Sequence, residues 1–430
     1  MGAIGIIIAL IVLCYFCLKN LSPLWAAPIC ALIVAFTNGL DGFTAFSETY
    51  MGAFADFAKG YLMVFLLGGI FGKLMEVTGA ANAIGEVVIK LVGKKRSVLA
   101  VILACAIMTY GGISLFIVMF VMWPIAAAAF RDANVPRQLF PGAYAVGCYT
   151  FTMTALPGSP QIQNLIPTSY FGTTPMAAPV LGIIASILFL GFGIVWMNFR
   201  EKQMVKQGIG WTENPDSKLE NLDDLPKLNK VLAFLPLVTV IIVLNALSMD
   251  ATIALTAGII VNIIIGLGKV PFQKMIGKLN EGAIESLEIS LITAAIVGFG
   301  AVVKETPTFN NLADAVFGMN INPLIIVIVA VNLLCGICFS ASGGMSIALA
   351  TLGDRFIAMS QSTGIPLQVF HRITSISSGG MDTLPPGVIA LLRYCGCSYK
   401  ESYLDIFMTS VLAPIVISLI CALLASFGVC

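Results

Sequence analysis

The chain has 430 residues, of which 58% are hydrophobic and only 10% are charged, and its formal net charge is +1. An ordinary soluble domain carries about 25% charged residues, so this chain lacks the polar side chains that would cover a surface in water. The composition therefore predicts a protein embedded in a lipid bilayer. The sequence contains no basic stripe, which argues against a nucleic-acid partner.

The first apolar run, residues 2–18, has the length of a secretory signal peptide or of a membrane span. No charged segment precedes it, no small-residue cleavage site follows it, and a second apolar run begins shortly after Asn20. We therefore predict a span rather than a cleaved leader.

Apolar runs long enough to cross a bilayer, which takes about 20 residues per helix, recur along the chain. Two of them are interrupted by Gly and Pro, and the polar segment 200–229 separates the first five runs from the last five. The predicted spans are residues 2–18, 23–39, 61–77, 138–170 (interrupted), 176–199, 231–248, 251–268, 287–303, 366–396 (interrupted) and 403–427.

Two further apolar stretches, residues 97–130 and 321–351, are too long for one crossing and too short for two. The first contains Gly111 and Gly112 near its middle, and the second contains the small-residue segment 340–344. We predict that each forms a re-entrant hairpin, which is tolerated only when it is buried in protein or lines a wet cavity.

The two halves of the chain also share short segments at a nearly constant offset. The matching pairs are Val135–Phe140 with Ile365–Phe370, Tyr110–Ser114 with Ser342–Ser346 and, in part, Leu156–Gly158 with Pro385–Gly387. Because each half contains an odd number of spans, the second must insert upside down, as in the inverted repeats of secondary transporters. The predicted units are an N-terminal repeat (1–199), a cytoplasmic linker (200–229) and a C-terminal inverted repeat (230–430).

The basic residues predict an orientation through the positive-inside rule. If the linker faces the cytoplasm, most of the 23 Lys and Arg residues lie on that side, whereas Lys59, Lys304 and Arg355 lie on the other. We therefore predict a multi-pass protein of the bacterial inner membrane with both termini outside. The first hairpin would enter from the cytoplasm and the second from outside.

Four breaks are expected to meet near the middle of the membrane, namely the two hairpin tips and the two interrupted spans. Ser159, which precedes a proline, is typical of a helix start, and Asp382 or Thr383 is expected to cap a new helix in the second interrupted span. The return arms of the hairpins are expected to begin next to Ser114 and next to Ser346. Four helix N-termini would thus offer N–H groups and partial positive charge to a carboxylate.

Polar and small residues at these breaks are expected either to bind the rest of a hydroxylated ligand or only to satisfy the broken backbone. The predicted substrate-binding residues are Gly111, Gly112, Ser114, Ser159, Gln161, Gln163, Asn164, Ser342, Gly343, Gly344, Ser346 and Thr383.

Charged side chains inside spans are costly and mark functional sites. Those in the ninth span are Asp382 at its break and His371 and Arg372 nearer its outer end. We predict Asp382 as the proton-coupling group and His371, the single histidine, as the second candidate. The competing interpretations are that Asp382 only caps a helix and that Arg372 only reaches outward or pairs with a neighbour.

The cysteines include two CxxC pairs, Cys14 with Cys17 and Cys335 with Cys338, out of eleven in total. Both pairs lie inside apolar runs without a neighbouring His, which favours small apolar residues in packed helices over a zinc site. No metal or other cofactor is expected.

The segments Ala155–Asn164 and His371–Pro385 resemble the gluconate permease (GntP-type) family of the ion transporter superfamily. The similarity extends over the whole chain and implies proton symport of a small hydroxy-monocarboxylate such as gluconate, glycerate or 3-hydroxybutyrate. Gluconate permeases typically have His-Asn after the Leu-Pro of the second segment, whereas this chain has Pro386 and Gly387. That departure favours a shorter hydroxy acid such as 3-hydroxybutyrate.

The resemblance also implies a homodimeric elevator. Spans 1–3 and 6–8 would form a scaffold that dimerises, and the hairpins with spans 4, 5, 9 and 10 would form a moving transport domain. The predicted fold class is therefore an all-α polytopic membrane protein with two inverted repeats of five spans, each containing a re-entrant hairpin and a discontinuous helix.

The alternatives to proton symport are of three kinds. A sodium-coupled carboxylate transporter fits the same breaks. An anion channel is disfavoured by the inverted repeat and by the lack of a repeated charged ring. A membrane enzyme is not predicted, because the chain lacks an HExxH motif, a GxSxG motif and a pair of carboxylates at the breaks.

Overall fold

The computed structural model describes residues 2–19, 21–213, 226, 228–309, 311, 321–384 and 388–430. Within these ranges every regular element is helical. Stretches with the length and hydropathy to cross a membrane are Gly42–Val77, Pro179–Lys206, Phe272–Lys304 and Tyr399–Ser426, and shorter apolar helices accompany them.

The first half of the chain contains the longer hairpin turn and the first broken segment. In chain order its helices are α1 (Gly2–Leu18), α2 (Pro23–Thr37), α3 (Gly42–Thr44), α4 (Met51–Val77), α5 (Ala80–Val92), α6 (Ser97–Tyr110), α7 (Leu115–Ala133), α8 (Phe140–Cys148), α9 (Phe151–Thr154), α10 (Ile162–Phe171) and α11 (Pro179–Lys206).

The second half contains the second hairpin and the second broken segment. Its helices are α12 (Leu235–Ile241), α13 (Ala251–Gly266), α14 (Phe272–Lys304), α16 (Pro323–Cys338), α17 (Ala341–Thr363), α18 (Leu367–Ser378), α19 (Ile389–Tyr394), α20 (Tyr399–Phe407) and α21 (Ala413–Ser426). Short π-helical segments at Ala45–Tyr50, Ile242–Ala246 and Met408–Leu412 continue α3, α12 and α20.

Two predicted spans are only parts of longer helices. The third, 61–77, is the second half of the stretch 42–77, which begins where the carboxylate of Asp41 accepts a hydrogen bond from the Thr44 N–H at 2.7 Å. The eighth, 287–303, is the second half of α14. Polar residues lower the hydropathy of both first halves, and several of them, including Asp56 and Glu285, lie on exposed faces where a helix carries them at little cost.

The hydropathy pattern also missed α5, which lies between the third span and the first hairpin. Its apolar face, including Ile84 and Val88, is buried, and its polar face, including Glu86 and Lys90, is exposed. The helix packs against both α6 and α7. An amphipathic helix of this length has too low a mean hydropathy to be recognised as a span.

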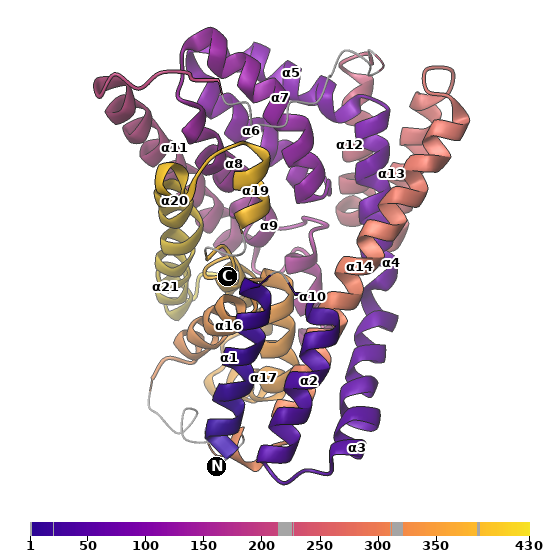
Figure 1. Cartoon of the computed structure of the whole chain (residues 1–430), viewed down its shortest axis with the longest axis vertical. Helices are drawn as coiled ribbons and strands as arrows, with labels where there is room; N and C mark the ends of the chain where they lie inside the picture. Colours follow the sequence, from indigo (N-terminus) through magenta and orange to yellow (C-terminus); the bar gives the residue numbers. More distant parts are fainter. Residues whose placement is uncertain are drawn as a thin grey trace.

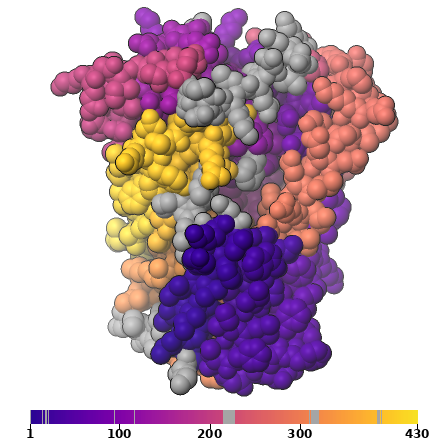
Figure 2. Space-filling model, in the orientation of Figure 1, coloured from indigo at the N-terminus to yellow at the C-terminus, as the bar shows by residue number. Residues whose placement is uncertain are grey.

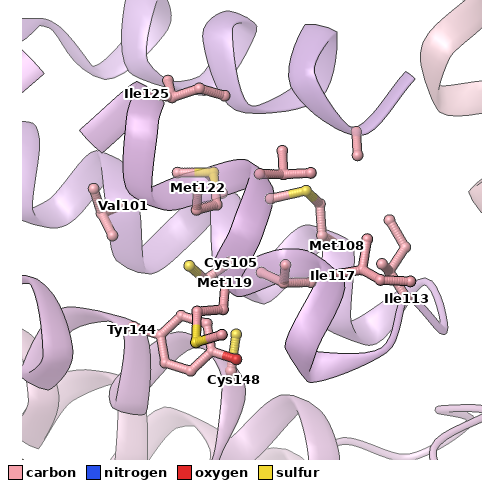
Figure 3. Packing of buried hydrophobic residues seen from close by; sticks show 14 of the residues in the cluster. Val101, Cys105, Met108, Ile113, Ile117, Met119, Met122, Ile125, Tyr144 and Cys148 are labelled. Carbon is pink, nitrogen blue, oxygen red and sulfur yellow. The ribbon is translucent and has the colours of Figure 1, made fainter. Parts of the chain in front are cut away.

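Each predicted hairpin consists of two helices that pack against each other. In the first, α6 and α7 are joined by residues 111–114, and buried side chains including Val101, Cys105 and Met122 form one cluster around them (Figure 3). In the second, α16 and α17 are joined by only Phe339 and Ser340. The Ser340 hydroxyl accepts a hydrogen bond from the Gly343 N–H at 3.1 Å.

The start of α17 corrects one prediction. The return arm begins at Ala341, because Ser340 caps it, and not next to Ser346. Gly343 and Gly344 therefore lie in the first turn of a regular helix instead of at the tip. A Cβ on Gly344 would lie 2.3 Å from the backbone of Cys335, so this glycine allows the two arms to approach closely.

The broken segments correct two further predictions. Gly158 has a positive φ of 76°, and α10 begins at Ile162 rather than directly after Ser159. The Ser159 hydroxyl accepts a hydrogen bond from the Gln161 N–H at 3.3 Å, so it orders the turn before the helix.

In the second broken segment, α18 ends at Ser378 and α19 begins at Ile389 with Val388 before it. Neither Asp382 nor Thr383 therefore caps α19, the next helix whose bounds the structure describes. The repeat match at Pro385–Gly387 lies outside the described residues.

The long helices α4 and α14 pack along each other, with α2 against α14 and α13 against α4. Helices α4, α13 and α14 stand at one side of the molecule, and α11, α20 and α21 stand at the other (Figure 1). The hairpins and the broken segments lie between them, and α1 and α2 cover the lower front (Figures 1 and 2).

Polar contacts join the parts that were predicted to share a side of the membrane. The base of the first hairpin contacts the start of the linker, where Arg131 pairs with Glu213 at 3.0 Å and Asn134 accepts a hydrogen bond from the Trp211 N–H at 3.0 Å. At the other end, Asn322 donates to Ser426 at 2.8 Å. The rest of the linker, residues 214–225 and 227, lies outside the described residues.

Candidate functional site

A cavity of about 380 Å³ lies where the two hairpin tips and the two breaks approach each other. Its volume is within the range of roughly 300–1,000 Å³ that is usual for small-molecule sites. Both halves of the chain contribute to the lining, together with the middle of α4 and of α14. Among the described residues that line the cavity there is no Lys, Arg or His.

Three helices begin at this cavity. They are α7, α10 and α17, and the residues that precede them, Ser114, Gln161 and Ser340, all belong to the lining. Neither Ser114 nor Gln161 accepts a hydrogen bond from its own helix through its side chain, whereas Ser340 does. The first turns of α7 and α10 therefore lack a side-chain cap, and their N–H groups and positive dipole ends are suited to an anion.

The first hairpin and the first break are joined by hydrogen bonds around this site. The Gln161 amide donates to the carbonyls of Thr109 at 2.6 Å and Ile113 at 3.4 Å. The Tyr110 hydroxyl donates to the carbonyl of Pro157 at 2.9 Å. The relative position of the N-termini of α7 and α10 is thereby held by the chain itself.

The second break contributes Asp382 and Thr383 to the lining. The Thr383 hydroxyl lies 2.9 Å from that of Ser410, which connects the break to the last long helix. The Oδ1 atom of Asp382 is buried and has no hydrogen-bond partner among the described residues. A buried carboxylate oxygen beside a cavity is placed to receive a proton or a ligand donor.

His371 and Arg372, the other charged candidates, lie away from the cavity and are fully buried. Arg372 donates to Asn164 Oδ1 at 2.9 Å and to the carbonyls of Pro175 at 3.2 Å and Ala177 at 2.7 Å. The Nδ1 atom of His371 lies 2.7 Å from the Thr173 hydroxyl, and its Nε2 atom lies 3.4 Å from Asn164 Oδ1. Arg372 therefore neither reaches outward nor forms an ion pair among the described residues.

Asn164 is fully buried at the centre of that cluster. Its amide nitrogen donates to the carbonyls of Ser159 at 2.9 Å and Pro175 at 3.0 Å. Since Arg372 and His371 occupy its oxygen, the side chain has no remaining capacity for a ligand. It holds α10, the loop after it and α18 together.

The structure thus divides the predicted site residues into two sets. Those that line the cavity are Gly112, Ser114, Gln161, Gln163, Ser342, Thr383 and Asp382. Those that do not are Gly111, Ser159, Asn164, Gly343, Gly344, Ser346 and His371.

Several lining residues were not predicted. Met119 comes from α7, Tyr149 and Met153 come from the first broken segment, and Ser286 and Thr293 come from α14. None of them lies at a Gly or Pro break, so no local signal distinguishes them. Among the described residues no group of three or more His, Cys, Asp or Glu side chains is arranged to hold a metal.

Comparison with known proteins agrees with this architecture. The profile of the family described as GntP family permease matches residues 1–427. The uncharacterized transporter YxjC of Bacillus subtilis (strain 168) is 36% identical over 473 aligned residues, which cover 100% of both chains. An uncharacterized transporter of Haemophilus influenzae (strain Rd) is 25% identical over 265 residues, covering 60% of this chain and 59% of its own.

Among solved structures, the YdaH transporter of Alcanivorax borkumensis is similar with a TM-score of 0.61 at 15% identity, covering 90% of each chain. This likeness shows a shared helical membrane-transporter fold. The family profile and the Bacillus relative confirm the resemblance seen in the sequence. The chain therefore belongs to the GntP permease family, and it is a multi-pass membrane transporter rather than an enzyme.

Proposed function

We propose that this secondary transporter carries a small hydroxy-monocarboxylate together with a proton. The observation that supports the proposal best is the convergence of three helix N-termini, two of them without a side-chain cap, on one cavity. Since no cationic side chain is found among the described lining residues, backbone N–H groups would neutralise the carboxylate. Ser114, Ser342 and Gln163 would bind the hydroxyl.

A binding panel tests the substrate class. Purified protein is heated with gluconate, glycerate, 3-hydroxybutyrate or a dicarboxylate, each with and without sodium. We expect stabilisation by at least one hydroxy-monocarboxylate, because a ligand that binds only the folded state raises the unfolding temperature. Stabilisation by the dicarboxylate alone would contradict the proposal, and a sodium requirement would favour the sodium-coupled alternative.

Asp382 is the proposed proton carrier, because it lines the cavity and has a buried oxygen without a partner among the described residues. Uptake into proteoliposomes against a substrate gradient should then require an inward pH gradient and should stop when an uncoupler is added. Uptake that only follows the substrate gradient down would favour a channel.

We also propose that the protein works as a dimeric elevator. Helices α1–α4 and α12–α14 would form the scaffold, and the two hairpins with α8–α11 and α18–α21 would move. The cavity lies between these groups, since Gly69 and Thr293 face it from one group and Gln161 and Thr383 from the other. A native mass measurement in mild detergent should give a dimer, and a pure monomer would count against this arrangement.

A further inference from the structure

We propose that Met119, Tyr149 and Met153 form a subsite for an alkyl end of the substrate. The transporter would then select short hydroxy acids that end in a methyl group over acids that carry a hydroxyl on every carbon. This inference rests on the proposed function, since it names the part of the same cavity that receives the end of the ligand opposite its carboxylate.

The subsite is close to the proposed carboxylate position. Leu115 and Met119 both line the cavity from α7, the first at its N-terminus and the second one turn later. Four residues of an α-helix rise about 6 Å. A ligand whose carboxylate lies at the N-terminus of α7 therefore places its third or fourth carbon beside Met119.

The wall around Met119 consists mainly of aromatic and sulfur-containing side chains, and it is held in place. The Tyr144 hydroxyl donates to the carbonyl of Leu115 at 2.6 Å, so this group is already occupied. The rings of Tyr144 and Tyr149 lie edge to face with their centroids 5.3 Å apart. Met119 lies beside Tyr144 and Cys148 (Figure 3), and both Met119 and Met153 expose only a small fraction of their surface.

Several polar groups of the cavity are used within the protein. The Gln161 amide nitrogen binds the carbonyls of Thr109 and Ile113, and the Ser340 hydroxyl caps α17. The Thr383 hydroxyl is paired with Ser410. By contrast, Gln163 Oε1 is buried without a partner among the described residues, so it is available to one substrate hydroxyl.

A polyhydroxy acid would therefore bury several hydroxyls against Met119, Tyr149 and Met153. Each hydroxyl that loses water without gaining a partner weakens binding. A methyl group at the same place gains from leaving water. The distribution of polar and apolar side chains thus favours one hydroxyl near Gln163 and an alkyl end near the two methionines.

Two acids that differ by one methyl group test the subsite directly. Dissociation constants of 3-hydroxybutyrate and 3-hydroxypropionate are measured on the purified full-length chain, with gluconate as a third ligand. We expect 3-hydroxybutyrate to bind about fourfold more tightly or better than 3-hydroxypropionate, as burial of one methyl group predicts. Gluconate should bind most weakly.

Met119→Gln and Met153→Gln should each bring the ratio of the dissociation constants of 3-hydroxypropionate and 3-hydroxybutyrate toward one. Met122→Gln is the matched control, because Met122 is buried on the same helix but does not line the cavity. It should lower the unfolding temperature of the free protein without changing the ratio. If either cavity variant fails to fold, the ratio of the two dissociation constants in the wild-type protein still tests the subsite.

A wild-type ratio near one would overturn the subsite while leaving the proposed function intact. The same holds for a ratio that survives both cavity substitutions. If none of the three acids binds, the proposed function is wrong and the subsite falls with it.

Discussion

At the scale of single residues, two polar side chains of the ninth span have separate environments. Asp382 lines the cavity, whereas Arg372 is buried behind it among carbonyl oxygens. Burying a charged group is costly unless hydrogen bonds compensate for the lost water. Arg372 has such compensation, and Oδ1 of Asp382 has none among the described residues. Arg372 is therefore expected to contribute to stability, and Asp382 is expected to contribute to transport.

Asp382→Asn should abolish uptake driven by a pH gradient and spare exchange of pre-loaded substrate. Exchange requires only that the loaded carrier crosses, whereas net uptake requires the empty carrier to return after releasing its proton. We expect gradient-driven uptake to fall roughly tenfold or more, within the usual range of coupling between two ligands. Initial rates of both modes in proteoliposomes measure the effect.

Asp354→Asn serves as the control, since Asp354 is exposed and pairs with Lys304 on the surface. An exposed ion pair contributes little to stability. Near-normal uphill uptake by the Asp382 variant would exclude this residue as the proton carrier. His371 would then be the next candidate, although it does not line the cavity.

Arg372→Lys should destabilise the protein even though it keeps the charge. A lysine ammonium cannot replace the planar fork that contacts Asn164, Pro175 and Ala177. Leaving buried carbonyls unpaired should lower the free energy of unfolding by about 2–4 kcal/mol. Arg393→Lys, on an exposed side chain, should change it little. Equal unfolding midpoints for the two variants in denaturant titrations would show that the contacts of Arg372 contribute nothing.

At the scale of elements, the first break is held against a helix of the proposed scaffold. The Asn245 amide donates to the carbonyl of Gly158 at 2.9 Å and to that of Ile241 at 3.1 Å. Asn245 lies in the π-helical segment Ile242–Ala246, and such segments are frequent at functional sites. The contact joins the two groups of helices that an elevator would move past each other.

Gly158→Ala should impair folding and transport more than Gly208→Ala. Both glycines have a φ of 76°, but a Cβ on Gly158 would lie 2.5 Å from the Asn245 side chain, whereas nothing lies within 4 Å of Gly208. The Gly208 variant therefore has only the backbone cost of about 1–2 kcal/mol. The Gly158 variant adds overpacking of about 1–3 kcal/mol.

Unfolding midpoints and uptake rates of the two variants separate these contributions. Adding Asn245→Ala to Gly158→Ala removes the clash and should restore part of the lost stability. An unchanged double variant would show that the Asn245 contact does not limit the break.

At the scale of the whole molecule, the end of α11 and the end of α17 are predicted to lie on opposite sides of the membrane. Gln207 follows α11 near the start of the linker, and Ser362 lies at the end of α17, and both are exposed. A cysteine at Ser362 should react with an impermeant maleimide on intact cells. A cysteine at Gln207 should react only after the membrane is permeabilised. The reverse result would contradict both the orientation and the placement of the linker.

The native cysteines give this experiment a low background among the described residues. Those whose side chains the structure describes are buried, except Cys430, which is partly exposed and is replaced by serine for the labelling. Reaction of the serine variant without an introduced cysteine serves as the baseline.

The sequence by itself determined the family, the helical class and the approximate positions of the hairpins and breaks. Hydropathy and Gly/Pro interruptions are properties of neighbouring residues, so the sequence alone predicts hairpins at residues 97–130 and 321–351. Hydropathy did not predict the amphipathic α5 or the polar first half of α14, because their apolar faces are too narrow to raise the mean hydropathy.

Only the tertiary structure decided which polar groups face the cavity. Gln163 and Asn164 are neighbours in the chain, yet Gln163 lines the cavity and Asn164 is enclosed by Arg372 and His371. Adjacent residues of a helix point about 100° apart, and the partners that surround each face come from distant segments. The same reason explains Met119 and Met153, which became part of the cavity lining only when α7 and the first break were packed together.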